Sequence, residues 1–166
     1  GGLCDQGLNE KGEAGKPRGK ARRPFRKRLV HLQLLDLSHS NQLKDEWLQM
    51  TLPHLKSLTW IDFTNCIQLT HAIIPCIIEL KDSVSHLALS DCPKIDSAMC
   101  ISLNQLYKLE CLYMSNSTIS NDQLFQLLSN FPHNKLMDLS LMNCNQLTNT
   151  TEAIHTISTY CSKILA

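Results

Sequence analysis

The chain has 166 residues, of which 43% are hydrophobic, and this is enough for one domain with a packed core. Nine basic and three acidic residues give residues 1–28 a net charge of +6, whereas seven basic and twelve acidic residues give residues 29–166 a net charge of −5. All six glycines lie at or before Gly19, and every arginine lies at or before Arg28. Residues 29–166 therefore lack both the glycine-rich loop and the guanidinium groups that bind phosphate, which argues against a nucleotide-dependent enzyme.

Residues 1–28 are predicted to form a disordered basic arm. Pro17, Gly19 and Pro24 oppose helix formation within its most basic part, residues 16–28. Such a cluster is typical of a localisation signal or of contacts with nucleic acid or acidic surfaces. A solubilising linker, a cloning remnant, or a segment that folds back on the acidic remainder of the chain are the alternatives. The candidate contact residues are Lys16, Arg18, Lys20, Arg22, Arg23, Arg26, Lys27 and Arg28.

A nine-residue segment recurs after the arm. It reads LDLSHSNQL from Leu35, and equivalent segments begin at Ile61, Leu87, Leu112 and Leu139. The steps of 26, 26, 25 and 27 residues fall in the 20–29-residue range of leucine-rich repeats. Alternation of apolar and polar residues at the start of each segment predicts a short strand with its leucines pointing inward.

The remainder of each repeat also follows a pattern. A cysteine or serine is expected to be buried where the chain leaves the strand, followed by an apolar residue that fills the core (Ser40, Cys66, Cys92, Ser117, Cys144; Leu43, Leu69, Ile95, Ile119, Leu147). Apolar residues at helical spacing then predict a helix in each repeat (Trp47, Leu48; Ile73, Ile74, Ile77; Met99, Leu103; Leu124, Leu127, Leu128; Ile154, Ile157). Candidate helix caps are Asp45, Asp96, Asn121 and Thr150, and asparagines are expected to adopt positive φ in the turns.

This pattern, clearest in residues 84–96, resembles the cysteine-containing leucine-rich repeats of F-box substrate receptors, and the resemblance covers residues 29–166. It implies a right-handed α/β solenoid of about five repeats, with a concave parallel sheet and helices on the convex side. It also implies a protein-binding role, either as a ubiquitin-ligase substrate receptor or as a subunit of a larger assembly. Residues 1–28 contain no F-box. Residues 161–165 look like the opening of a sixth repeat, so we expect the domain of residues 29–166 to be truncated at its C-terminal end.

The outward positions of the strands form the candidate binding face. Trp60 and Tyr113 belong to the residue types that dominate interface energies. We expect a basic or amphipathic protein partner on the concave side; the alternative is that these are ordinary exposed residues. A nucleic-acid or ribonucleoprotein binder that uses the basic arm is the second functional hypothesis. The candidate residues of the face are Leu34, Asp36, Trp60, Asp62, His86 and Tyr113.

No catalytic, cofactor-binding or metal-binding residues are expected. The eight cysteines form no C-x-x-C pair, and their spacing follows the repeat, which is typical of buried thiols in a reducing compartment. The cytoplasm or nucleus is therefore expected, with a mitochondrial or axonemal assembly as the alternative. Cys111 lies outside the buried column and is the candidate reactive thiol on the sheet. The sequence contains no apolar run of the ~20 residues needed to span a bilayer, and we expect no small-molecule substrate.

Overall fold

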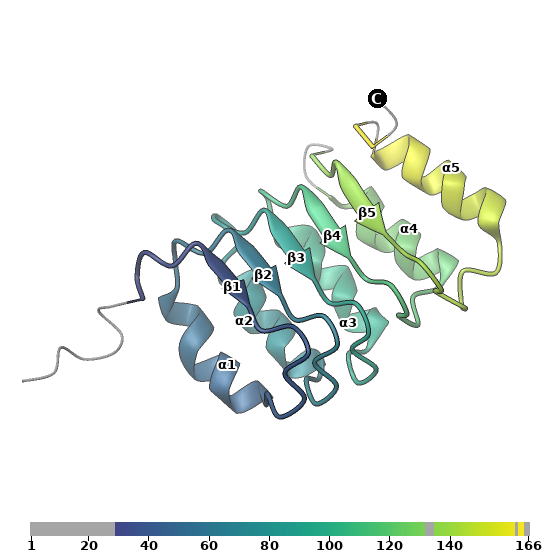
Figure 1. Cartoon of the computed structure of the whole chain (residues 1–166). Coiled ribbons are helices and arrows are strands. Elements are labelled where there is room, and N and C mark those ends of the chain that lie inside the picture. The colour runs from purple at the N-terminus through teal and green to yellow at the C-terminus, as the bar shows by residue number, and fades with distance from the viewer. Residues whose placement is uncertain (1–28, 132–134, 162, 165–166) are drawn as a thin grey trace, which may run out of the picture.

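The computed structural model describes residues 29–131, 135–161 and 163–164, so the basic arm lies outside the described residues. The described part confirms the α/β solenoid (Figure 1). Its five strands form one sheet in the order β1-β2-β3-β4-β5, and each adjacent pair is parallel. The strands are β1 (Leu34–Asp36), β2 (Trp60–Asp62), β3 (His86–Ala88), β4 (Cys111–Tyr113) and β5 (Asp138–Ser140).

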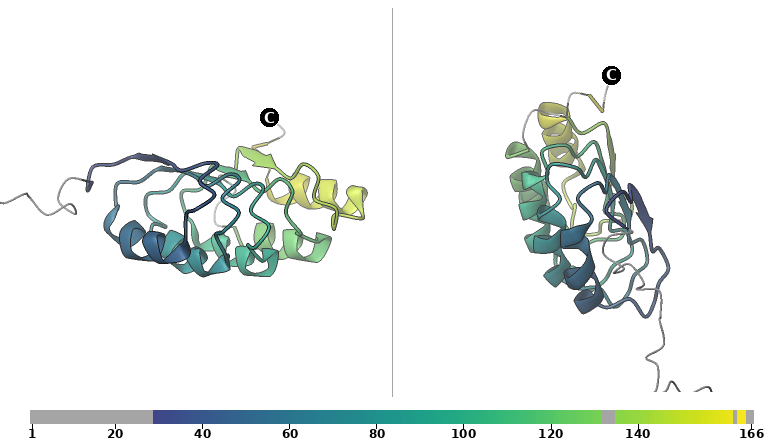
Figure 2. Two further views of the ribbon diagram at one scale, coloured as in Figure 1. Left: turned by 60° about the horizontal axis from the view of Figure 1, so that its bottom comes forward. Right: turned by 90° about the vertical axis from the view of Figure 1, so that its left-hand side faces the viewer.

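A helical segment follows each strand, and Figure 2 shows these segments in a layer on one side of the sheet. The other side of the sheet carries no helix in the described part of the chain. The helical segments are α1 (Asp45–Thr51) with η2 (Leu52–His54), η3 (His71–Ile73) with α2 (Ile74–Ile78), α3 (Ser97–Cys100) with η4 (Ile101–Gln105), α4 (Asn121–Ser129) and α5 (Thr150–Tyr160).

The strand register confirms the repeat. Leu35 pairs with Ile61, Ile61 with Leu87, Leu87 with Leu112 and Leu112 with Leu139. Ile61, Leu87 and Leu112 have no exposed surface, whereas the two outer residues are partly buried because, within the described residues, each has a neighbouring strand on one side only. The five residues that begin the repeats therefore share one interior.

The thiol column is confirmed as part of this interior. Cys66 donates its S–H to the carbonyl oxygen of Leu37 at 3.1 Å, and Cys92 donates to that of Phe63 at 3.1 Å. Cys144 makes the equivalent contact with Met114 at 3.3 Å. Each thiol thus satisfies a backbone carbonyl of the preceding repeat, at a point where the chain has left the sheet.

Each of the five described repeats has one residue with a positive φ. Residues 29–166 contain no glycine, so other residues have to adopt this conformation. Their φ values are all 57–59°, and they include a histidine and an aspartate as well as asparagines (His39, Asn65, Asp91, Asn116, Asn143). The backbone N–H of four of them donates to a carbonyl of the next repeat, as in the 2.9 Å bond from Asn65 to Ser90. The left-handed turn is therefore part of the contact between repeats.

Replacing Asn65 with alanine is expected to lower the free energy of unfolding by about 1–2 kcal/mol. Alanine keeps the Cβ that crowds the following carbonyl in this conformation but lacks the short polar side chain whose local hydrogen bonds make the conformation tolerable for asparagine. Asn65→Gly should be close to neutral, since glycine has no Cβ. Both variants lose the 2.9 Å hydrogen bond from Asn65 to His39, so their difference isolates the backbone effect. Urea denaturation provides the measurement; equal stability of the two variants would contradict this account.

Two details of the helices differ from expectation. Among the apolar residues whose spacing predicted the helices, Trp47, Met99 and Ile154 are exposed. Neighbouring residues on a helix point about 100° apart, and in these short helices Leu48, Cys100 and Ala153 face the core instead.

The predicted caps are correct only at Asp96, whose carboxylate accepts the N–H of Ala98 at 2.9 Å. The cap residues of α4 and α5 are Ser120 and Asn149, one position before those expected. Asp45 lies in the first turn of α1 and binds the next repeat: its carboxylate accepts the N–H and hydroxyl of Thr70 at 2.9 and 2.7 Å. One-residue errors of this kind arise because several polar residues adjoin each helix start.

Candidate functional site

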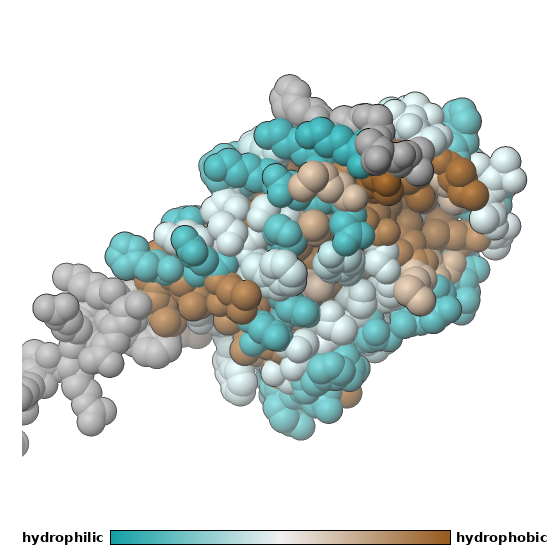
Figure 3. Space-filling view, turned by 45° about the horizontal axis from the view of Figure 1, so that its top comes forward, coloured by the Kyte–Doolittle hydropathy of each residue, from teal (hydrophilic) through white to brown (hydrophobic). Residues whose placement is uncertain are grey.

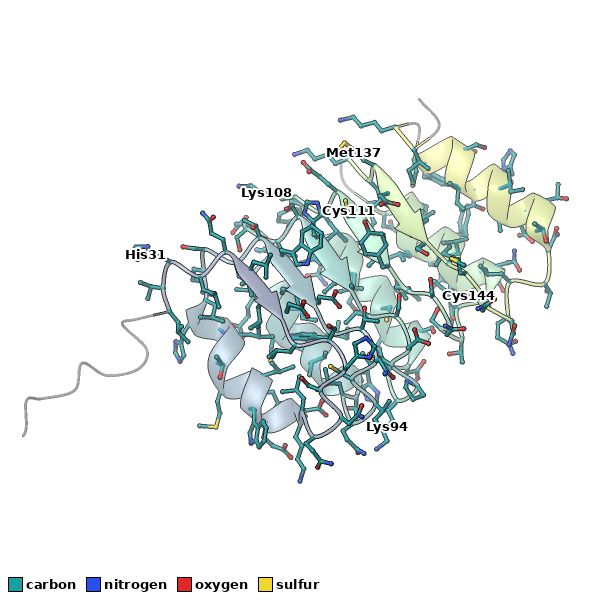
Figure 4. The ribbon with its side chains drawn as sticks, viewed as in Figure 1. His31, Lys94, Lys108, Cys111, Met137 and Cys144 are labelled. Atoms are coloured by element: carbon teal, nitrogen blue, oxygen red, sulfur yellow. The ribbon has the colours of Figure 1, made fainter. Side chains whose placement is uncertain are left out.

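The outward face of the sheet carries the candidate residues in two rows. The parallel register places one row at Leu34, Trp60, His86, Cys111 and Asp138, and the other at Asp36, Asp62, Ala88, Tyr113 and Ser140. Figure 4 shows this side of the sheet with its side chains. The structure therefore brings all six predicted residues onto one surface.

Trp60 and His86 form an aromatic pair across β2 and β3. Their ring centroids are 4.5 Å apart and the ring planes differ by 15°, so the rings are stacked. Ser85 lies 2.9 Å from His86 Nδ1 and helps to orient its ring. Leu34 and Trp60 are 55% and 36% exposed, which leaves an apolar and aromatic ridge open to solvent across β1 and β2.

Asp36 and Asp62 lie beside this ridge at the ends of β1 and β2. Oδ1 of Asp36 accepts the N–H of Ser38 at 2.9 Å, and Oδ1 of Asp62 accepts that of Thr64 at 2.8 Å. The bond from Ser38 lowers the pKa of Asp36, which keeps this carboxylate charged. Within the described residues, Oδ2 of each aspartate has no hydrogen-bond or ion-pair partner.

In the C-terminal half of the face, polar side chains form hydrogen bonds with one another. The Tyr113 hydroxyl donates to Oδ2 of Asp138 at 2.6 Å, and this bond raises the pKa of Tyr113. Ser115 and Ser140 hydroxyls are 2.8 Å apart on the same side. The outward face therefore carries the ring of Tyr113 without a free hydroxyl, and the repeat pattern did not reveal the pairing of this hydroxyl with Asp138.

Cys111 lies on the outward face of the sheet, as expected, but its surroundings do not support a role as a reactive thiol. Cys111 is 8% exposed, because its outward side chain is small and lies between those of His86 and Asp138 on the neighbouring strands. Desolvation raises the pKa of Cys111, which lowers the fraction of reactive thiolate at neutral pH.

Desolvation raises the pKa of the thiols in the core more than that of Cys111. Burial raises the pKa of Cys92 and Cys161 to about 11 and that of Cys100 to about 12. A thiol whose pKa is raised in the folded state contributes its full stabilisation at pH values below the ordinary thiol pKa of 9.0. The contribution is lost as pH rises toward the folded value, because the unfolded chain releases its protons first. Stability should therefore fall as pH rises from about 9 to 11.

In Cys100→Ala the loss of stability over this pH interval should be smaller than in the unmodified chain. Urea denaturation at several pH values, with the alanine variant as the internal reference, measures the difference. Parallel pH profiles for the two proteins would show that Cys100 does not contribute.

The histidine and cysteine side chains in the turns after β1 and β2 make structural contacts. His39 Nδ1 contacts the Asn65 amide at 2.9 Å, and Cys66 is buried and donates to a backbone carbonyl. Among the described residues, no three histidine, cysteine or acidic side chains are grouped so as to hold a metal ion. None of the helices in this part of the chain has the length and apolar content needed to cross a membrane.

The C-terminal end of the described sheet carries further apolar surface that the repeat pattern did not indicate. Figure 3 shows brown surface at the right-hand end of the molecule, around β5 and α5. In the sequence of this last repeat, Met137, Met142 and Ile154 are exposed. Their partly buried neighbours Leu139 and Leu141 occupy core positions. The signal that could have identified this surface is the position of these residues in the last of five stacked repeats.

The repeat period, the parallel register and the buried thiol column together define a leucine-rich-repeat-like α/β solenoid. No protein-family model matches the chain, and no curated protein sequence matches it. Several solved structures share the fold. The tropomodulin C-terminal domain of Caenorhabditis elegans aligns with a TM-score of 0.63 and 11% identity over 83% of this chain and 87% of that one. Actin-binding site 2 of leiomodin-1 aligns with a TM-score of 0.64 and 12% identity over 84% of each chain.

The yeast complex of Rad7 with Elc1 contains a third similar structure, with a TM-score of 0.58 and 16% identity. The alignment covers 75% of this chain and 30% of that one. At these identities the likeness establishes the fold, and the function has to be argued from the surface.

Proposed function

We propose that this chain is a non-enzymatic protein-binding module that holds its partner on the outward face of the sheet. The observation that carries the proposal is the ridge of Leu34, Trp60 and His86, open to solvent on a surface where Asp36 and Asp62 each keep one carboxylate oxygen without a partner among the described residues. Aromatic anchors with adjacent charged groups are typical of interface hot spots. Two of the similar structures are described by a protein that they bind, actin and Elc1 respectively.

The chemistry of the face suits a basic or amphipathic partner. The five strands contain three aspartates and neither lysine nor arginine. A partner with an apolar residue for the ridge and a cation for the aspartates would match it. Such a module serves as a substrate-receptor-type domain or as a subunit of a larger assembly, inside the cell where its thiols stay reduced.

Photo-crosslinking from single positions tests where the partner binds. A photoreactive amino acid at Leu34 probes the sheet face, and one at Met50 on α1 is the matched control, because both side chains are exposed and apolar. A partner captured from cell extract at position 34 and not at position 50 agrees with the proposal. The reverse pattern would move the binding surface to the helix layer.

A second candidate function, nucleic-acid binding, is favoured by the eight basic residues of residues 16–28, which lie outside the described residues. Phosphate contacts make affinity fall steeply with salt. Fluorescence anisotropy with labelled RNA and DNA, between low and moderate salt, tests this directly. Undetectable binding, or an affinity that does not change with salt, would exclude the second function.

A further inference from the structure

We propose that residues 16–28 of the same chain occupy the acidic–aromatic corner of the sheet, defined as Leu34, Asp36, Trp60 and Asp62, when no partner is bound. This inference rests on the proposed function of the face, because it assigns an internal competitor to the same surface. The corner lies at the N-terminal edge of the sheet, beside the point where the described chain begins at Leu29 (Figure 1).

The first argument is electrostatic. Asp36 and Asp62 are directly opposite each other on adjacent parallel strands. Like charges in that arrangement destabilise a sheet. No ion pair neutralises either carboxylate within the described ranges, where the ion pair present joins Lys56 and Glu79. A cation held between the two free oxygens would relieve this repulsion, and a guanidinium group can bind two carboxylate oxygens at once.

The second argument is the composition of the occupant. All five arginines of the chain lie within residues 16–28, and residues 29–166 provide none. Phe25 stands between Arg23 and Arg26, so the segment also offers an apolar ring beside its cations. Trp60 can accept an arginine over its ring, and Leu34 beside it is open to solvent. The charges of +6 in residues 1–28 and −5 in residues 29–166 are complementary as well.

The third argument is reach. The chain turns at Leu29–Leu32, where the N–H of Leu32 donates to Leu29 at 3.0 Å, and β1 begins two residues later. Thirteen residues span at most about 43 Å when extended, whereas five strands at about 4.8 Å spacing are only about 19 Å apart from first to last. Residues 16–28 are therefore long enough to cross the whole face.

Tethering makes this contact effective even if it is intrinsically weak. A short linker gives the attached segment an effective concentration of about millimolar. An external partner must displace it, and the apparent affinity falls in proportion to the fraction of chains whose face is free. The contact would thus set the affinity that an external partner must exceed. It favours partners whose cationic and apolar side chains bind the corner more tightly than residues 16–28 do.

The test uses the full chain and a labelled synthetic peptide of residues 16–28 as the probe. In one variant Arg22, Arg23, Arg26 and Arg28 are replaced by glutamine. In the matched control the same four charges are removed at exposed positions elsewhere, Lys44, Lys94, Lys108 and Lys163. We expect the peptide to bind the arginine variant about fivefold or more tightly than the lysine control, because the tethered competitor is lost.

A location control accompanies this comparison. Adding Trp60→Ala to the arginine variant should abolish the gain in peptide affinity, whereas adding Trp47→Ala, on the helix side, should leave it intact. Equal affinity for the arginine variant and the lysine control, or no binding to any variant, would overturn the inference. Neither result bears on crosslinking from position 34, so failure of the proposed function remains separately visible.

Discussion

Replacing Leu87 with alanine is expected to lower the free energy of unfolding by about 2–5 kcal/mol, the range for truncating a buried leucine. Leu87 lies on the middle strand, has no exposed surface and pairs with Ile61 and Leu112 in the neighbouring repeats. In a repeat protein each unit is stabilised by its neighbours, so a cavity at this position weakens the contacts on both sides. Urea denaturation followed by circular dichroism measures the change.

Leu34→Ala is the matched control, because Leu34 also lies on a strand but is 55% exposed. Its effect should stay within about 0.5 kcal/mol, as for most surface substitutions. If Leu87→Ala shifted stability no more than Leu34→Ala, the placement of the repeat leucines in one interior would be wrong.

Replacing Trp60 with alanine is expected to weaken binding of the partner captured from position 34 by at least about 1 kcal/mol, or roughly fivefold. The substitution removes the exposed ring and its stacking with His86 at 4.5 Å. Tyr113→Ala should have a comparable effect because the ring of Tyr113 lies on the same face. Isothermal titration calorimetry with the purified partner gives the affinities.

Trp47→Ala provides the control for the loss of a tryptophan. Trp47 is 57% exposed on α1, on the side of the molecule where the helices lie. Its replacement should leave the affinity unchanged. Unaltered affinity in both Trp60→Ala and Tyr113→Ala would place the binding site elsewhere on the solenoid.

The sequence predicted the strands and their register well because both depend on one repeated pattern. Once Leu35, Ile61 and Leu87 are equivalent, parallel stacking places Trp60 beside His86 without further information. The thiol column could be predicted for the same reason: a small, weakly polar side chain recurs at one position, and each repeat offers it a carbonyl of the previous one.

The sequence did not predict in the same detail which side chains of the helix layer are buried. Its segments are as short as three residues in η2 and η3, so one turn decides which side chain is buried, and neighbouring residues such as Trp47 and Leu48 are both apolar. The repeat pattern also could not predict side-chain contacts that do not recur from one repeat to the next. The bonds from Thr70 to Asp45 and from Tyr113 to Asp138 each join two repeats but occur once, so no periodicity indicates them.

Only part of the acidic–aromatic corner could be predicted from the sequence. The repeat places Asp36 opposite Asp62, and only the structure shows that each uses one oxygen for a backbone N–H, while the other has no partner among the residues that the structure describes. A stable protein retains such a like-charge pair at a cost. That cost is readily understood if the pair serves to bind a cation.

Hydroxyl-radical footprinting by mass spectrometry, with and without the bound partner, tests the central claim most directly. The chain offers two matched pairs of aromatic side chains: Trp60 and Tyr113 on the sheet face, and Trp47 and Tyr107 outside the strands. Binding should protect Trp60 and Tyr113 from oxidation and leave Trp47 and Tyr107 unchanged. Protection of Trp47 or Tyr107 with Trp60 and Tyr113 still reactive would contradict the assignment of the sheet face as the binding surface.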